Sequence, residues 1–358
     1  MTAAVRRRPA FRRLRVARVD RLTDDAAAVT FDVPADVAGD YVFQPGQSLT
    51  LRRTDGDRDE RRDYSICAPA GSPLRIGVRE VPGGLFSSWL VHAVRPGDEI
   101  EVLPPSGRFT ADLSVPGGHV FVVAGSGITP ALSLAGTLLA DGESTVTVFY
   151  GNRRTDTVMF ADELADLKDR HGPRLTLVHL LSREPRDAEV TSGRLDGPRL
   201  RRLVDALVDV PGVDHWWLCG PHGLVTAAQA LLAELDVPRE RVHQELFYVD
   251  DVPPEPVRGD AATVSGPSSE VTVVLDGRAT PLTLPRDVPV LDAAQEVRGD
   301  LPFACKGGVC GTCRARVTHG EVRMRRNYAL EPEELAAGYV LTCQSLPVSD
   351  ELTVDYDA

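Results

Sequence analysis

Short apolar runs separated by turn residues fill the first 112 positions of the chain. Each run is five to eight residues long, and glycine, proline, aspartate or serine stands between successive runs. The runs that follow a first strand pattern from Phe11 are 28–33, 47–52, 64–68, 74–81 and 99–103. Short strands spaced by turns are typical of an all-β barrel or sandwich. We therefore expect an antiparallel β-barrel domain over residues 1–112.

The pattern changes near Leu113, where strand-like runs begin to alternate with helical ones. The expected strands are 119–124, 145–150, 175–180 and 214–219, and the expected helices are 130–140, 162–170 and 224–235. Strands alternating with helices indicate βα units and hence a parallel sheet. We expect a doubly wound α/β domain over residues 113–250.

Residues 120–140 carry no charged side chain and are long enough to raise the possibility of a membrane span. The stretch contains Gly125, Ser126, Gly127, Thr129 and Pro130, which are residues that form turns. It is better interpreted as a buried strand, a tight loop and a helix, so we expect no membrane association.

A linker and a third domain follow. Residues 251–268 are rich in proline and serine and lack apolar periodicity, which is typical of a linker. Apolar runs at 271–275 and 281–284 then predict a hairpin that opens a domain over 269–358. A chain of 358 residues is too long for one ordinary hydrophobic core, which agrees with this division.

Composition, charge and cysteine content argue against some classes of function. Apolar residues make up 42% of the chain and charged residues 26%, as in globular proteins. The net charge of -12 argues against nucleic-acid binding, although eight arginines lie in the first 21 residues, where a first strand with solvated arginines is favoured over a binding arm. Six cysteines without a signal peptide predict a reducing, cytoplasmic location without disulfides. The eight histidines are expected at surface or loop positions.

Four of the cysteines have the spacing C-x4-C-x2-C, followed after 29 residues by the fourth. They are Cys305, Cys310, Cys313 and Cys343. Four thiolates in this order can hold a [2Fe-2S] cluster, whereas structural zinc would normally show two C-x2-C pairs. The intervening glycines allow backbone N–H groups to approach the cluster. The segment from about Ser269 resembles the plant-type ferredoxin domain, which implies a β-grasp fold.

The barrel contains a second signal, the run from Arg62 to Cys67. With the segments 83–90 and 97–109, it resembles the ferredoxin-reductase superfamily in order and spacing. The resemblance implies that Arg62 meets a flavin pyrophosphate, that the Tyr64 ring lies on the isoalloxazine and that the Ser65 hydroxyl approaches N5. Each role suits the chemistry of its side chain.

The same resemblance implies pyrophosphate contacts at the start of a helix. A glycine pair that opens a helix supplies N–H groups for a diphosphate, so Gly84, Leu85 and Ser87 are the candidates. FAD is the expected flavin, with FMN as the alternative.

The α/β domain carries a candidate nicotinamide site. Gly125, Gly127, Thr129 and Pro130 follow a buried strand and open a helix, which is where a dinucleotide phosphate binds in a doubly wound sheet. Downstream, the run Cys219-Gly220-Pro221 resembles the superfamily motif beside the nicotinamide. Cys219 would contact the nicotinamide, although a small buried side chain at a strand end is the alternative.

Further residues bear on the electron donor and the reacting groups. Residues 150–154 contain no acid for a ribose 2'-hydroxyl, and Ser182 and Arg183 resemble the segment that holds a 2'-phosphate. NADPH is therefore the expected donor, with NADH possible. The resemblance also implies that Phe247 covers the flavin. It assigns the catalytic positions to Tyr64, Ser65, Cys219 and Glu245.

These parts together predict an electron-transfer protein. A nicotinamide delivers two electrons as a hydride and a [2Fe-2S] cluster accepts one, so a flavin is needed between them. The whole chain resembles the reductase components of bacterial oxygenases. The reductase subunits of phenylacetyl-CoA epoxidase are a closer likeness, which is carried by residues 322–331, 338–345 and 355–357 together with 61–67 and 150–153. That resemblance implies a multisubunit di-iron oxygenase as the electron acceptor.

Three alternatives stay open. The chain could serve another oxygenase such as a 3-ketosteroid 9α-hydroxylase, which shares the domain order. It could be a zinc-stapled binding module with no electron exit, or a free-standing reductase of small acceptors, for which an iron-sulfur domain would be superfluous.

Overall fold

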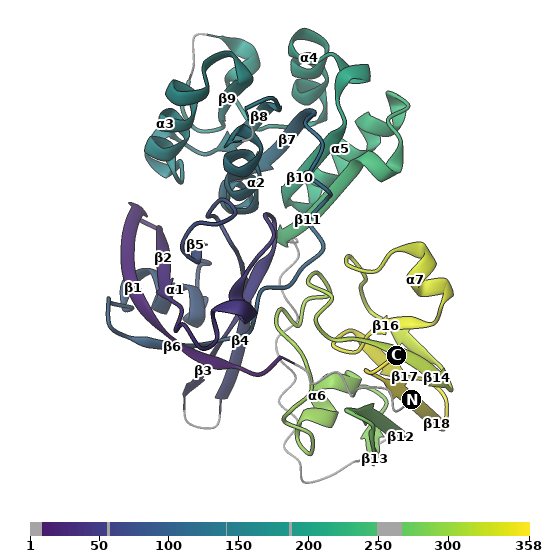
Figure 1. The fold of residues 1–358 in the computed structure, drawn as a ribbon. Helices are drawn as coiled ribbons and strands as arrows, with labels where there is room; N and C mark the ends of the chain where they lie inside the picture. Colours follow the sequence, from purple (N-terminus) through teal and green to yellow (C-terminus); the bar gives the residue numbers. More distant parts are fainter. Residues whose placement is uncertain (1–8, 56–57, 141, 186–187, 249–266) are drawn as a thin grey trace. The chain divides into compact units, whose positions relative to one another are not determined.

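The computed structural model describes residues 9–55, 58–140, 142–185, 188–248 and 267–358. The chain divides into two compact units (Figure 1). One comprises Phe11–Glu60 and Tyr64–Asp250, and the other comprises Asp251–Ala358 with the short segments Met1–Ala10 and Arg61–Asp63. The expected linker at 251–268 lies almost wholly outside the described residues, so the predicted boundaries stay a prediction.

The first part of the larger unit is a six-stranded barrel. Its strands are β1 (Arg12–Thr23), β2 (Ala26–Asp32), β3 (Ser48–Asp55), β4 (Arg58–Ser65), β5 (Arg75–Arg79) and β6 (Glu99–Val102), in the order β4-β3-β6-β1-β2-β5. An antiparallel bridge between Ile66 and Ile76 joins the two edges of this sheet and closes the barrel. Helix α1 (Leu85–His92) contributes Phe86 and Leu90 to the barrel core.

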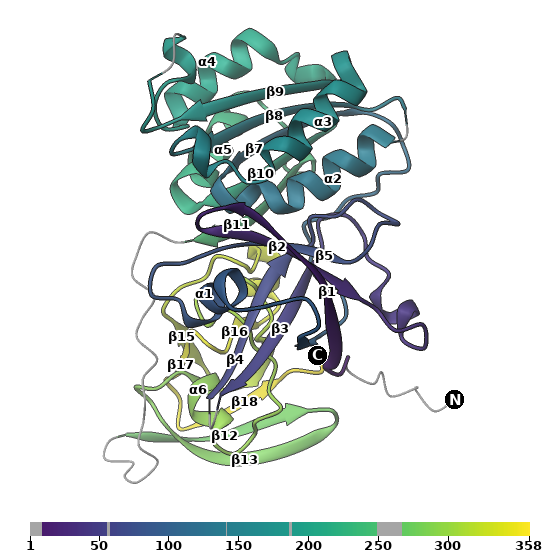
Figure 2. The same cartoon turned by 90° about the vertical axis from the view of Figure 1, so that its left-hand side faces the viewer.

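The second part of the larger unit is a parallel sheet with helices on both faces (Figure 2). The sheet has the order β11-β10-β7-β8-β9. Its strands are β7 (Gly118–Ala124), β8 (Thr145–Asn152), β9 (Leu175–Leu181), β10 (His215–Pro221) and β11 (Val242–Tyr248). Helices α2 (Ile128–Ala140) and α3 (Ala161–His171) share one core cluster, and α4 (Gly197–Leu207) and α5 (His222–Glu234) share another. The strand order reverses between β7 and β10, which is where doubly wound sheets bind ligands.

The second unit has a five-stranded mixed sheet of order β13-β12-β18-β14-β16 and a separate β15-β17 pair. Its strands are β12 (Ser268–Leu275), β13 (Arg278–Pro285), β14 (Arg314–His319), β15 (Val322–Met324), β16 (Tyr339–Leu341), β17 (Ser345–Pro347) and β18 (Glu351–Asp355). Helix α6 (Val290–Gln295) packs Val290 and Leu291 into the core, and α7 (Pro332–Ala336) precedes β16. Strands β12 and β18 pair in parallel, as in a β-grasp fold. The predicted fold class of all three parts is confirmed.

Several elements differ from the sequence-based expectation, and β4 and α4 are two of them. The strand expected at 64–68 is β4, which begins at Arg58 and ends at Ser65. All six residues of 58–63 are charged, and a strand pairs through its backbone, so apolar periodicity does not reveal this strand. Helix α4 was not expected, although Asp196 caps it with a hydrogen bond to the amide of Arg199. Within the described residues, no helix is long and apolar enough to cross a membrane.

Candidate functional site

The two predicted nicotinamide motifs lie against each other. Strand β7 ends at Ala124, and a tight 3-10 turn over Gly125–Gly127 leads into α2, with Gly125 in the left-handed region at φ 56°. A Cβ atom at Gly127 would lie 2.2 Å from the carbonyl oxygen of Cys219, which lies near the end of β10. Glycine is required there because the two backbones touch. The carboxyl ends of β7 and β10 therefore form one edge, with both motifs on it.

Two side chains fix the conformation of this loop. The Tyr150 hydroxyl donates a hydrogen bond to the carbonyl of Gly125 at 3.0 Å, and the Thr129 hydroxyl donates to the carbonyl of Ser126 at 2.9 Å. Tyr150 is fully buried at the end of β8, and Pro130 is buried in the first turn of α2. The loop is thus preorganised by its own domain. Sequence reasoning missed Tyr150, although its position just before the end of the strand next to β7 is a usable signal.

The predicted catalytic residues converge on one carboxylate. The Ser65 hydroxyl donates to Oε2 of Glu245 at 3.2 Å, and the Cys219 thiol donates to the same oxygen at 4.0 Å. Cys219 and Glu245 are directly paired on β10 and β11, while Ser65 ends β4 of the barrel. Tyr64 precedes Ser65 and is half-buried, and Phe247 packs against the core two residues after Glu245. The structure therefore brings barrel and nicotinamide residues together.

The environment determines the protonation of Cys219. Burial raises its pKa well above the usual thiol value, and the nearby Glu245 carboxylate raises it further. The side chain has no exposed surface. It is therefore a neutral thiol that can donate a hydrogen bond, and it is not a thiolate nucleophile.

The predicted pyrophosphate contacts surround the start of α1. Gly84 is the N-cap residue and has no side chain to cap the helix, so the N-terminus suits a phosphate group. The Ser87 hydroxyl accepts a hydrogen bond from the amide of Val81 at 3.0 Å and donates to the carbonyl of Gly84 at 3.2 Å. Ser87 therefore stabilises the turn with its side chain. Leu85 is exposed at the same helix end.

Two further predicted flavin residues, Arg62 and Tyr64, belong to β4. Arg62 is exposed, and its Nη1 donates a hydrogen bond to the carbonyl of Arg61 at 2.7 Å. The ring centroid of Tyr64 lies 6.0 Å from the ring centroid of Phe86 in α1. A cationic fork, an aromatic face and an uncapped helix start are the groups that a flavin dinucleotide requires, so the residues fit FAD.

The candidate 2'-phosphate residues lie where β8 and β9 end. The amide of Ser182 donates to the carbonyl of Asn152 at 2.9 Å, and the amide of Arg183 donates to the carbonyl of Arg153 at 2.8 Å. The pairing of the strands thus continues beyond their ends and sets two arginines next to each other. Both arginines are exposed.

The nearby carboxylates are engaged in other contacts. Glu184 accepts hydrogen bonds from the amide and the hydroxyl of Thr155, both at 2.8 Å. Asp156 forms an ion pair with Arg154. The local charge at this edge therefore favours an anion over a ribose hydroxyl that needs an acceptor.

The four predicted cluster ligands form two pairs of sulfurs. Cys310 has the largest effect on the pKa of Cys305, and Cys313 is the largest cause of the raised pKa of Cys343. The contact with Cys310 and the backbone N–H groups of Val309 and Gly307 lower the pKa of Cys305 to about 6, even though burial opposes this shift. A two-iron cluster needs two thiolates on each iron, so the arrangement fits a [2Fe-2S] cluster. Over the described residues, no group of three ligand-type side chains is gathered as a single metal ion would require.

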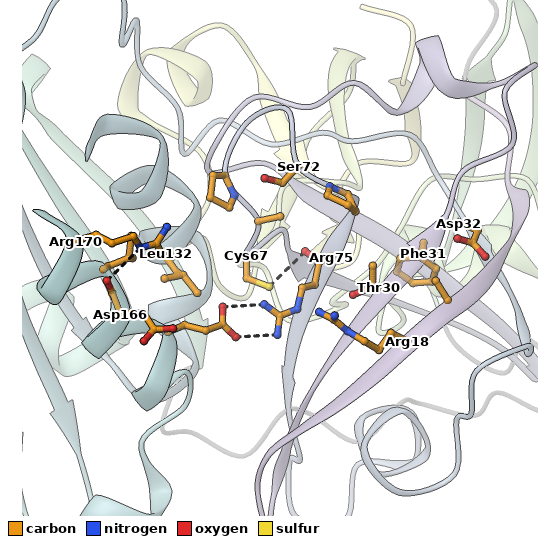
Figure 3. Close-up of a pocket in the computed structure, with 16 residues that line it drawn as sticks. Arg18, Thr30, Phe31, Asp32, Cys67, Ser72, Arg75, Leu132, Asp166 and Arg170 are labelled. Atoms are coloured by element: carbon orange, nitrogen blue, oxygen red, sulfur yellow. Dashed lines mark hydrogen bonds and ion pairs between the residues drawn. The ribbon is translucent and has the colours of Figure 1, made fainter. Parts of the chain in front are cut away.

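A cavity of about 500 Å³ lies elsewhere in the larger unit and contains none of the predicted site residues (Figure 3). Arg75 of the barrel lies in it and forms a bidentate ion pair with Glu163 of α3, with both N–O distances 2.9 Å. Burial raises the pKa of the neighbouring Cys67 to about 12, so this thiol is unreactive at neutral pH. These contacts hold the barrel against the α/β domain.

Three neighbouring histidines are among those that depart from the expected surface positions. His119 is buried, and its imidazole stacks on that of His215, with ring centroids 5.2 Å apart. His215 Nδ1 lies 2.9 Å from His243 Nε2, and the ring of His243 stacks on Trp217 with centroids 4.2 Å apart. The expectation was wrong because parallel strands align their first residues at one edge, which scattered sequence positions do not reveal.

The fold and the sites define an oxidoreductase with an iron-sulfur domain. Residues 121–230 match the oxidoreductase NAD-binding domain family, and residues 273–348 match the 2Fe-2S iron-sulfur cluster binding domain family. The structure of phthalate dioxygenase reductase aligns with a TM-score of 0.61 at 22% identity, and the match covers 96% of this chain and 98% of that one. This last likeness shows the shared fold.

Full-length relatives identify the family. The chain is 40% identical over 353 residues to one of the subunits of 1,2-phenylacetyl-CoA epoxidase from Escherichia coli, with 97% of this chain and 98% of that protein covered. It is 34% identical to the ferredoxin reductase component of 3-ketosteroid-9-alpha-monooxygenase from Mycobacterium tuberculosis H37Rv, with 96% and 95% covered. The chain belongs to the family of oxygenase reductases that includes these two proteins. The predicted reductase class, with FAD, a nicotinamide and a [2Fe-2S] cluster, is confirmed.

Proposed function

We propose that this chain passes electrons from NADPH through FAD and a [2Fe-2S] cluster to a multisubunit di-iron oxygenase, namely a phenylacetyl-CoA epoxidase of phenylacetate degradation. The observation that carries the proposal is the meeting of Ser65 and Cys219 on the Glu245 carboxylate. A barrel residue with a predicted flavin role and a strand residue with a predicted nicotinamide role share one hydrogen-bond partner. Hydride transfer requires these two rings to meet.

The cofactors supply the conversion of a hydride into single electrons, and the protein supplies binding and orientation. The loop at Gly125–Gly127 binds the nucleotide phosphates with its backbone. Glu245 accepts hydrogen bonds from the Ser65 hydroxyl and the Cys219 thiol and so fixes both side chains at this point. Burial of Ser65 and Cys219 excludes water from this point. In the second unit, Cys305 with Cys310 and Cys313 with Cys343 would each hold one iron.

NADPH is the proposed donor because the edge of β8 and β9 is cationic. Arg153 and Arg183 are adjacent and exposed, whereas Asp156 and Glu184 are engaged by other groups. Guanidinium groups match phosphate oxygens geometrically and would bind the 2'-phosphate.

The choice of oxygenase rests on the higher identity to the phenylacetyl-CoA epoxidase protein, 40% against 33–34% for the 3-ketosteroid monooxygenase components. The test is reconstitution of the purified holoprotein with the oxygenase subunits of each system, with NADPH as donor and oxygenated product as the readout. We expect product with the epoxidase and little with the steroid hydroxylase. Product with the steroid hydroxylase alone would overturn the proposed partner.

A further inference from the structure

Gln344 connects the two segments that carry the cysteine ligands. It follows Cys343, and only 1% of its surface is exposed. Its Nε2 donates to the carbonyl of Lys306 at 2.8 Å and to the carbonyl of Cys343 at 3.0 Å, and it lies 3.7 Å from the Cys343 sulfur. One carboxamide thus ties the loop of the first three cysteines to the fourth cysteine.

Lys306 is held in an unfavourable backbone conformation. Its φ is 51°, in the left-handed region, which is unfavourable for a residue other than glycine. Its ammonium donates to Asp292 Oδ1 at 2.8 Å and to Gln295 Oε1 at 2.7 Å, both on α6, and lies 4.7 Å from the centre of the Phe303 ring. The backbone carbonyl is bound by Gln344 and the side chain by α6, so the strained residue is fixed from two sides.

The identity of residue 306 supports this interpretation. The chain has 40 basic residues, and lysine occurs only at positions 168 and 306. The compact ammonium of Lys306 donates to a carboxylate and a carboxamide at the same time, which is a geometry different from that of a planar guanidinium fork. Lysine at this point in an arginine-rich chain indicates a geometric requirement.

The contacts that Gln344 and Lys306 make with each other and with α6 are called the clamp below. The clamp affects a predicted cluster ligand through the two residues that follow Lys306. The amide of Gly307 donates to the Cys305 sulfur at 3.3 Å. Gly308 has φ 80°, and a Cβ atom there would lie 3.1 Å from Cγ of Gln344, so the loop packs closely on this side chain. The direction of the Gly307 N–H group therefore depends on Lys306 and Gln344.

We propose that Gln344 and Lys306 are positioning residues that hold the N–H donors of the loop on the cluster sulfur and thereby raise the reduction potential of the cluster. Donated hydrogen bonds stabilise the added negative charge of the reduced state, and their loss lowers the potential. The inference rests on the proposed four-cysteine ligand set.

The test is an anaerobic redox titration of the full-length holoprotein, followed by the electron paramagnetic resonance of the reduced cluster. We compare Gln344→Met, which keeps the side-chain length but cannot donate, with the wild type. A tenfold weaker equilibrium for cluster reduction corresponds to 59 mV for one electron. We expect a decrease of about this size, with NADPH-driven flavin reduction unchanged. The matched control is Gln229→Met, because Gln229 bonds only Gln244 within the α/β domain among the contacts described.

The possible outcomes distinguish failure of the clamp proposal from failure of the proposed four-cysteine ligand set. An unchanged potential in Gln344→Met with full iron content would overturn the positioning role. If that variant fails to retain its cluster, Lys306→Arg decides, since it keeps the charge but not the compact ammonium. We expect a smaller decrease in potential there, and no change would refute the clamp. Wild-type protein without iron and acid-labile sulfide would overturn the ligand set and the clamp together.

Discussion

Substitution of Gly127 by alanine tests the contact between the two nicotinamide motifs. The added Cβ would lie 2.2 Å from the Cys219 carbonyl oxygen and 2.7 Å from its carbon, whereas real Cβ atoms essentially never come within 3.0 Å of another atom. The two backbones must therefore separate by at least 0.8 Å, which is the shortfall from that limit. Overpacking of this kind costs roughly 1–3 kcal/mol of stability.

The displacement should affect the reaction more than the fold. Because the shift moves the phosphate-binding loop away from Cys219, the nicotinamide would lie about 1 Å from its productive position. A misplacement of that size can cost about 10²-fold in rate. We expect the rate of flavin reduction by NADPH, measured by anaerobic stopped-flow absorbance, to fall by one to two orders of magnitude, on the order of that estimate.

Gly223→Ala is the matched control in the same domain. No atom lies within 4 Å of the Cβ it would add, and Gly223 lies in the first turn of α5. An alanine in a helix is favoured by up to about 1 kcal/mol over glycine, so we expect a wild-type rate and equal or slightly higher stability. A Gly127→Ala protein with the wild-type rate of flavin reduction would refute the account of the loop.

Three further predictions follow from the sites. Cys310→Ser removes one iron ligand, so it should abolish single-electron transfer to a protein acceptor and leave NADPH-driven flavin reduction largely intact; loss of both activities would contradict the modular route. Arg183→Ala removes a charge-assisted contact worth about 1.5–3 kcal/mol, so the KM for NADPH should rise roughly 10- to 100-fold while the KM for NADH changes little. Arg202→Ala is the control at another exposed arginine. Equal effects on both nucleotides would exclude Arg183 from the 2'-phosphate role. Burial, and secondarily His215, lower the pKa of His243 to about 4, against about 6.5 in the unfolded chain, so the stability present above pH 6.5 is lost as the pH falls toward 4. After allowance for solvent exposure we expect a loss of about 1–2 kcal/mol, measured by urea unfolding followed by tryptophan fluorescence, and a flatter pH profile in His243→Gln; parallel profiles would contradict this.

The sequence predicted contacts that follow from topology. Gly127 and Cys219 lie more than 90 residues apart, yet Gly127 follows one strand and Cys219 lies near the end of another strand of the same parallel sheet, so their motifs had to share one edge. Ser65 and Glu245 came from two different domains. Their contact was implied by roles assigned through family resemblance and could not be derived from spacing.

Contacts made by single side chains were not predictable. Tyr150 and Gln344 are buried polar residues whose partners are backbone carbonyls, and no periodicity reports such a bond. Ser87 was predicted to contact the pyrophosphate. The sequence did not show that its hydroxyl would stabilise its own turn. The local role of Lys306 follows only from its left-handed φ and its contacts with α6.

The central claim is that electrons enter as a pair at the flavin and leave singly at the cluster. The most direct measurement is anaerobic mixing of the holoprotein with NADPH, with flavin absorbance and the cluster resonance signal recorded in the same time course, and iron and sulfide assayed on the same sample. The account predicts two irons and two sulfides per chain, flavin reduction first and cluster reduction after it, and no cluster reduction once FAD is removed. Zinc in place of iron, or a cluster that NADPH reduces in FAD-free protein, would contradict it.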